Sequence, residues 1–200
     1  MSAARTVWIA GSALISLLAA GCALGDEGAS PVSAVGTVAG TDAVVGASTE
    51  GGLVTFYLCG GPSSYDTATR WFVGAGDASG AFTLKRDGWT VTGDLGQGSG
   101  EVTSPDGETR AWRTHPATPG TLEGLYATVD SGCRTGAVIL QPDASAEPRL
   151  QGAWCDDSGQ FAQVTPILPV ALTAQGVGIR VLGASSKKDL FVEPVVVTKQ

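Results

Sequence analysis

Short apolar or β-branched runs separated by tight-turn signals dominate this sequence beyond its N-terminal region. In one run, Val54, Phe56 and Leu58 alternate with polar or amphipathic neighbours. Because successive side chains of a β-strand point to opposite faces, this period of two predicts a half-buried strand whose large side chains line a core. Asp87-Gly88 and Asp106-Gly107 each separate two such runs, and glycine after Asp supplies the positive φ that two-residue hairpin turns require. The pattern therefore predicts successive antiparallel hairpins.

The runs recur at spacings of roughly 8 to 12 residues, which is typical of β-barrels and β-sandwiches. Glycine contributes 29 of the 200 residues, which favours tight turns over helices. The predicted fold class is all-β, an antiparallel meander that forms a barrel or a barrel-like sandwich. A closed barrel is preferred because a meander leaves only its two end strands to pair. The predicted strands are residues 42–47, 53–59, 69–73, 81–85, 89–92, 100–103, 109–113, 136–141, 149–154, 178–182 and 190–197.

The sequences of two of these strands predict where each strand lies in the sheet. Ala137-Val138-Ile139-Leu140 is apolar on both faces and predicts a central strand. Pro194 lies inside the last predicted strand. Because proline lacks the N–H that a sheet ladder needs, this strand is expected at an edge or a bulge.

Two cysteines are placed symmetrically about a turn-rich stretch. Cys133 and Cys155 are equidistant from Ala144, which lies within residues 142–148. In a symmetric hairpin they would face each other with Cβ atoms about 4.5 to 5.5 Å apart, within reach of a disulfide. Cys59 competes as a partner for either, and otherwise is expected to be a buried, inert thiol. The absence of Cys-x-x-Cys disfavours a redox-catalytic role, so a structural Cys133–Cys155 disulfide is predicted, in an oxidising compartment.

The N-terminus has the pattern of an export signal. The apolar run from Val7 to Ala20 follows Arg5 and is too short to cross about 30 Å of hydrocarbon as a helix. Leu18-Ala19-Ala20-Gly21, directly before Cys22, resembles the lipobox of bacterial lipoproteins. This resemblance implies that Cys22 carries acyl chains such as palmitate and becomes the first residue of the mature chain. More than one acyl chain gives stable attachment to a membrane.

The predicted organisation has three parts. Residues 1–21 form a lipoprotein signal peptide, residues 22–33 a lipidated flexible tether, and residues 34–200 a single β domain. The tether prediction rests on small residues without an apolar period, which cannot offset the entropy lost on ordering. The expected location is outside the cytoplasm, anchored by lipid to a bacterial membrane, with the outer membrane or cell surface preferred.

The charge balance narrows the choice of partners. The chain has a net charge of −7, and removing Arg5 with the signal peptide leaves about −8. Such a surface repels phosphate backbones, so nucleic acid is not an expected partner. The expected contacts are the membrane, through the N-terminal lipid, and an envelope protein or glycan. The oligomeric state is left open.

The residues that could carry chemistry are few. His115 is the only histidine and precedes Pro116, which favours an extended or turn conformation. An exposed loop histidine is the preferred interpretation, and no catalytic residue is assigned. A hydrolase that uses His115 with a serine or aspartate brought near by the fold is the alternative, although no Gly-x-Ser-x-Gly motif occurs. Neither a cofactor nor a zinc site is expected from this donor set.

Four tryptophans lie in or beside predicted strands. They are Trp71, Trp89, Trp112 and Trp154. If their rings face outward they could bind carbohydrate or protein, because aromatic side chains dominate binding hot spots. Packing in the core is the preferred alternative, since small sheets bury their aromatic residues.

Short segments of the body resemble known exported proteins. Phe56-Tyr57-Leu58-Cys59-Gly60-Gly61 and Gly124-Leu125-Tyr126 resemble a pattern in uncharacterised small exported bacterial β proteins, which implies no activity. Residues 56–60 also resemble the Tyr-x-Cys opening of lipid-anchored inhibitors of C-type lysozyme, which are small β-barrels. The Ser-Gly-x-x-Tyr inhibitory stretch of that family is absent, because Asp130-Ser131-Gly132-Cys133-Arg134 ends without the tyrosine. No inhibitory residue is therefore carried over.

The predicted function follows from the anchor signal and the body together. It is a lipid-anchored cell-envelope protein with a non-catalytic binding or structural role. The alternatives are the hydrolase that uses His115, and a small-ligand carrier or an inhibitor of an envelope-directed enzyme.

Overall fold

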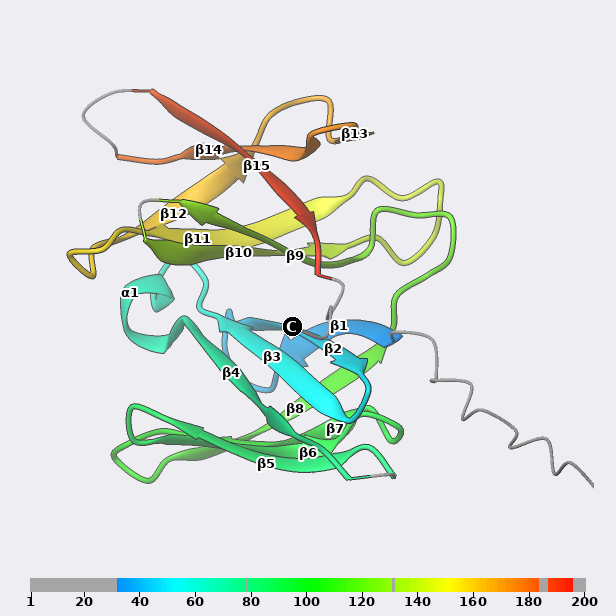
Figure 1. Cartoon of the computed structure of the whole chain (residues 1–200), viewed down its shortest axis with the longest axis vertical. Coiled ribbons are helices and arrows are strands. Elements are labelled where there is room, and N and C mark those ends of the chain that lie inside the picture. The colour runs from blue at the N-terminus through cyan, green and yellow to red at the C-terminus, as the bar shows by residue number, and fades with distance from the viewer. Residues whose placement is uncertain (1–31, 78, 131, 184–186, 196–200) are drawn as a thin grey trace, which may run out of the picture.

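The chain folds into two antiparallel β-sheets, each curled into a barrel-like structure (Figure 1). This computed structural model describes residues 32–77, 79–130, 132–183 and 187–195. The all-β fold class is confirmed, with one short helix, α1 (Tyr65–Ala68), among these residues. The predicted signal peptide, Cys22 and most of the predicted tether lie outside the described residues. Residues 32 and 33, predicted as tether, belong to the first strand.

The first barrel is an eight-stranded meander. Its strand order is β4-β3-β2-β1-β8-β7-β6-β5, so every pair of neighbours in the sheet is consecutive in sequence except β1 and β8. A bridge between Gly76 and Phe82 joins the two end strands. The strands are β1 (Val32–Val38), β2 (Val44–Glu50), β3 (Leu53–Cys59), β4 (Arg70–Ala75), β5 (Ala81–Arg86), β6 (Trp89–Asp94), β7 (Ser99–Thr103) and β8 (Thr109–Pro116).

Aromatic and aliphatic side chains fill the interior of this barrel. Val54, Phe56 and Leu58 point inward as predicted and are buried with the rings of Phe82 and Trp112. An eight-stranded barrel is just wide enough for side chains to fill its interior. This interior is therefore a packed core.

The second barrel is not a simple meander, because a pairing between strands that are not consecutive in sequence closes it. The sheet order is β12-β11-β10-β9-β15-β14-β13, and β12 also pairs with β14. The apolar side chains of Ala137, Ile139, Val177, Ile179 and Val192 are buried inside it. The strands are β9 (Gly124–Asp130), β10 (Cys133–Leu140), β11 (Arg149–Cys155), β12 (Phe161–Pro166), β13 (Leu172–Thr173), β14 (Gly176–Val181) and β15 (Lys188–Pro194).

Two predictions about strand position have different outcomes. The central strand is confirmed, because β10 lies between β9 and β11 and Val138 is buried on the face opposite to Ile139. The edge position of the last strand is wrong, because β15 lies between β9 and β14. Pro194 is tolerated because it is the last residue of β15, beyond the ladder with β14, which ends at Val192.

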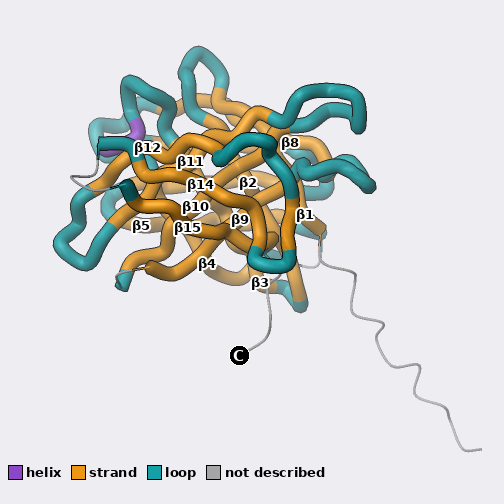
Figure 2. The backbone as a smooth tube through the Cα atoms, turned by 90° about the horizontal axis from the view of Figure 1, so that it is seen from above, coloured by secondary structure: helices purple, strands orange, loops and turns teal. Residues whose placement is uncertain are grey.

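The two barrels pack against each other through a buried apolar layer. Tyr57, Cys59 and Trp71 of the first barrel meet Leu125 and Val138 of the second. The Tyr57 hydroxyl donates to the Gly136 carbonyl at 3.2 Å, and the Trp71 indole donates to the Arg134 carbonyl at 2.9 Å. Figure 2 shows strands of the second barrel lying over those of the first. A single domain over residues 34–200 stays a prediction, for which this layer gives a physical basis.

The predicted disulfide is confirmed. Cys133 and Cys155 are bonded, with their Cα atoms 5.6 Å apart. The predicted register is off by one residue, because Gly136 pairs with Ala153 where a hairpin centred on Ala144 would pair it with residue 152. The register is the same along the whole ladder, so the difference arises between its end at Gly136–Ala153 and the bonded cysteines.

Across the described residues, no helix combines the length and apolar character needed to cross a membrane.

Candidate functional site

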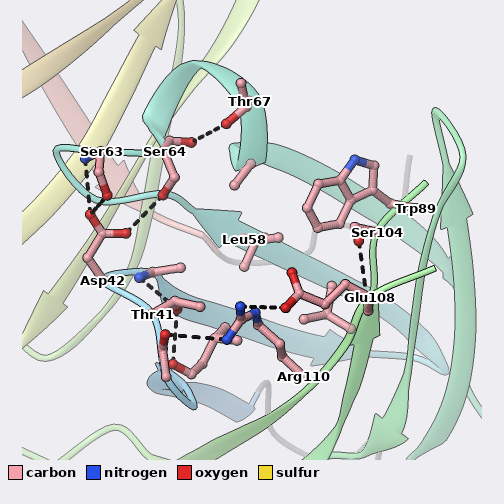
Figure 3. Close-up of a pocket in the computed structure, with 15 residues that line it drawn as sticks. Thr41, Asp42, Leu58, Ser63, Ser64, Thr67, Trp89, Ser104, Glu108 and Arg110 are labelled. Carbon is pink, nitrogen blue, oxygen red and sulfur yellow. Dashed lines mark hydrogen bonds and ion pairs between the residues drawn. The ribbon is translucent and has the colours of Figure 1, made fainter. Parts of the chain in front are cut away.

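An open groove lies at one end of the first barrel (Figure 3). In a meander every second connection reaches the same end, so residues 39–43, 60–69, 87–88 and 104–108 meet there. The first, second and fourth of these connections line a groove of about 580 Å³, together with Trp89 at the start of β6. Its apolar floor includes Val38, Leu58 and Val102, which belong to the barrel core. We call this groove the barrel mouth.

Asp42 fastens two of the connections together. Its carboxylate accepts hydrogen bonds from the Ser63 N–H at 3.1 Å, the Ser63 hydroxyl at 2.7 Å and the Ser64 hydroxyl at 2.9 Å. These bonds, led by that of the Ser63 hydroxyl, lower the pKa of Asp42 to about 2 against the opposing effect of burial. A Cβ at Gly61 would lie 2.4 Å from Asp42 Cγ, so glycine is needed there. The mouth thus carries a carboxylate that is ionised at neutral pH.

An oriented ion pair lines the other side of the mouth. Arg110 Nη2 lies 2.6 Å from Glu108 Oε1, and Arg110 Nη1 donates to the Gly40 carbonyl at 3.3 Å. The two side chains are 36% and 57% exposed, so their charged groups face solvent as well as each other. Both can therefore contact a ligand.

Trp89 forms an aromatic wall of the mouth. Its indole is partly buried against the core and lines the groove. The Arg70 guanidinium carbon lies 4.2 Å from the ring centroid, and Arg70 Nε donates to the Ala68 carbonyl at the end of α1. This stacking fixes the ring. An aromatic wall, an apolar floor and a few oriented polar groups are typical of small-molecule sites, which occur at the mouths of β-barrels.

The four predicted tryptophans do not converge. Trp112 is fully buried in the core of the first barrel, in agreement with the preferred interpretation of core packing. Trp71 is 7% exposed in the layer between the barrels. Trp89 lines the barrel mouth, and Trp154 lines a separate groove beside the second barrel, with Lys188 Nζ 4.5 Å from its ring centroid. Of the four, Trp89 and Trp154 therefore line open grooves, while Trp71 lines a smaller pocket.

His115 lies at the opposite end of β8 from the barrel mouth. Its side chain is 54% exposed, as predicted, but it belongs to a strand and not to a loop. His115 Nε2 lies 3.2 Å from Oε1 of the buried Glu123, which also accepts hydrogen bonds from Thr118 and Gln141. Burial alone would raise the pKa of Glu123, but these hydrogen bonds together lower it. The open groove beside His115 measures about 520 Å³, and Thr37 and Thr114 supply its hydroxyl groups among the described lining residues.

The remaining cysteine is buried between the barrels. Cys59 has no disulfide partner and is fully buried, and burial raises the pKa of its thiol to about 11. A thiol in this state is a poor nucleophile. Within the described parts of the chain, no three His, Cys, Asp or Glu side chains cluster as a metal site would require.

Sequence reasoning missed Asp42, Ser63, Glu108 and Arg110. They lie in or beside connections that are far apart in sequence. The sequence did contain one indication of this site. In a predicted meander, every second connection lies at the same end of the sheet. The sequence predicts the turn at Asp106-Gly107, but it does not indicate that the residues beside this turn belong to a site.

No protein-family model, curated protein or solved structure matches this chain. Evidence for function therefore comes from the grooves described above and from the N-terminal sequence.

Proposed function

We propose that this protein is a lipid-anchored binding protein of a bacterial cell envelope, and that the barrel mouth holds its ligand. The observation that carries the binding role is the convergence of Trp89, Asp42 and the Glu108–Arg110 pair on one open groove. The anchor is supported by the lipobox-like residues before Cys22. Cys22 attaches the chain outside the cytoplasm, at the outer membrane or cell surface.

The chemistry of the mouth favours a short glycan. A sugar ring presents C–H groups that pack on an indole face and hydroxyl groups that bond to carboxylates and guanidinium. Trp89 supplies the ring, while Asp42 supplies acceptors and Arg110 supplies donors. The rings of Phe56, Phe82 and Trp112 fill the space below, so the ligand stays at the mouth and does not enter the barrel.

Paired tryptophan variants test the ligand site. Binding of cellobiose, maltose and diacetylchitobiose to the purified protein is measured by titration calorimetry. Trp89→Ala should weaken the binding of the preferred sugar about tenfold, as loss of an aromatic hot spot does. Trp154→Ala is the matched control, since that indole also carries a stacked cation but lines another groove. Binding that is unaffected by Trp89→Ala, or no binding of any sugar, contradicts the glycan site.

The anchor has its own test. Cells that express the protein are grown with radioactive palmitate, and label should appear in the wild type and in Cys59→Ser but not in Cys22→Ser. Mass spectrometry should identify an acylated Cys22 as the first residue. An unmodified chain that retains residues 1–21 contradicts the anchor.

A hydrolase using His115 is the second candidate, because Glu123 orients the imidazole as a third group orients a catalytic base. If turnover of any envelope substrate is found, His115→Ala should abolish it. Turnover that is unchanged by this substitution excludes the site. Inhibition of an envelope-directed enzyme is a further proposal, and the same purified protein tests it by titration against lysozyme.

A further inference from the structure

Three arginines from both barrels line one small pocket. Arg70 of β4, Arg86 of β5 and Arg134 of β10 surround a pocket of about 290 Å³ beside the disulfide. We propose that this pocket binds the oxyanionic group of an organic molecule, such as a phosphate monoester or a carboxylate. The inference does not depend on the function proposed for the barrel mouth.

The local charge is opposite to that of the whole chain. The protein has a net charge of −7, whereas the pocket combines three guanidinium groups with only Asp66 and Asp87 as carboxylates. Asp87 is already paired with Arg86 at 3.3 Å. An anion repelled by most of the surface is therefore attracted here.

Arg134 is the best placed of the three to bind an anion. Its guanidinium carbon lies 3.9 Å from the centroid of the Trp71 ring, and no ion pair among the described residues involves Arg134. Burial lowers its pKa, which means that its charge is partly desolvated. A guanidinium that stacks on a ring uses its face, so the N–H donors on its edge remain available for bidentate contact with an oxyanion.

The pocket lies at the least paired seam of the first barrel. Among the described residues, backbone pairing at the seam between β4 and β5 consists of the bridge between Gly76 and Phe82 and a hydrogen bond from the Asp77 N–H to the Ala81 carbonyl, both at one end of the seam. At the other end, Arg86 Nη1 donates to the Trp71 carbonyl at 3.1 Å. The seam leaves room for a ligand where two sheet edges diverge.

Exposed apolar side chains border the arginines. Val73 is 54% exposed and Phe161 is 37% exposed, and both line the pocket. They would pack against the apolar part of a ligand whose charged group meets Arg134. An organic anion therefore fits better than an inorganic one.

Calorimetric titration of the purified protein tests the pocket, with phenyl phosphate, benzoate, inorganic phosphate and benzyl alcohol as probes. Phenyl phosphate or benzoate should bind more tightly than inorganic phosphate, and benzyl alcohol should not bind. Arg134→Gln should weaken binding about tenfold or more, since a hydrogen bond to a charged group contributes that much. Arg134→Lys keeps the charge but loses the planar fork, so its affinity should fall between those of wild type and Arg134→Gln.

Arg113→Gln is the matched control, because Arg113 is exposed on β8 and lines the groove of His115 instead. It should bind phenyl phosphate as the wild type does. Arg86→Gln provides a second variant at an exposed position and should also weaken binding. The proposal is overturned if neither organic anion binds at millimolar concentrations, if benzyl alcohol binds equally well, or if folded Arg134→Gln and Arg86→Gln both bind like wild type.

Discussion

At the scale of single residues, several of the aspartates that give the chain its negative charge accept hydrogen bonds within turns. Asp77, Asp143 and Asp156 each accept hydrogen bonds from the N–H and hydroxyl of the serine two positions later, and Asp106 accepts from the Ser104 hydroxyl. These bonds, led by those from the serine hydroxyls, lower the pKa of all four carboxyl groups. Asp side chains that bond to nearby backbone in this way specify turns. The negative charge therefore supports the hairpins.

These carboxylates predict acid sensitivity. A group whose pKa is lower in the folded state stabilises the fold above its unfolded pKa and loses this effect as the pH falls through its folded pKa. The unfolding temperature, followed by circular dichroism, should therefore fall as the pH is lowered from about 4 to about 2, the range set by ordinary Asp at 3.8 and Asp42 at about 2. Asp42→Asn should reduce the slope of this decline. An unfolding temperature that is constant over this interval contradicts the prediction.

At the scale of elements, a pair of glycines accommodates the largest side chain of the core. A Cβ at Gly93 would lie 2.1 Å from Cζ2 of Trp112, and one at Gly100 would lie 2.5 Å from the same atom. These glycines face each other on β6 and β7. The indole thus packs against two residues that have no side chains, which explains why a fully buried Trp112 fits into a barrel of this size.

A double-mutant cycle tests this packing. Gly93→Ala should destabilise the protein by about 2 kcal/mol or more, because the added methyl overlaps the indole. Combined with Trp112→Phe, which removes the overlapping ring, it should cost about 1 kcal/mol less than the sum of the single effects. Gly74→Ala, whose Cβ would meet Leu84 instead, should be additive with Trp112→Phe. Urea denaturation measures each free energy, and additivity in the Gly93 cycle contradicts the contact.

The disulfide stabilises the end of the β10–β11 hairpin. It joins residues separated by 22 positions, and closing such a loop restricts the unfolded chain by about 3 kcal/mol. The variant with both Cys133→Ser and Cys155→Ser should lose about that much free energy of unfolding. Dithiothreitol should lower the wild type to the level of the variant without changing the variant further. A second decrease in the reduced variant would point to an effect unrelated to this bond.

Sequence alone predicted most strands because their turns carry Gly, Asp or Pro and their faces alternate. It missed β1, β9, β12 and the two-residue β13, and β1 shows why. Ala34 and Val35 are buried on opposite faces of this strand, so the polar alternation that identifies a half-buried strand is missing. The barrel mouth was not predicted because its residues come from separate connections, and their convergence depends on the closure of the whole sheet.

At the scale of the molecule, the second barrel also braces the first. Gln151 Nε2 donates to the carbonyls of Asp42 and Cys59, each at 3.0 Å. Asp42 in turn binds the connection that carries Ser63. The position of one wall of the barrel mouth therefore depends on a side chain from β11. This contact explains how a packed second barrel, with no part in the mouth itself, contributes to the site.

The buried layer between the barrels predicts that they unfold together. Tyr57, Leu125 and Val138 are almost fully buried in it, and separating the barrels would expose them to water. Calorimetry should give one transition with equal calorimetric and van't Hoff enthalpies. Val138→Asp places a carboxylate in this layer and should split the transition in two or lower its midpoint strongly. Val129→Asp, on an exposed position of β9, should leave one transition near the wild-type midpoint, and two transitions in the wild type would show that the barrels are separate folding units.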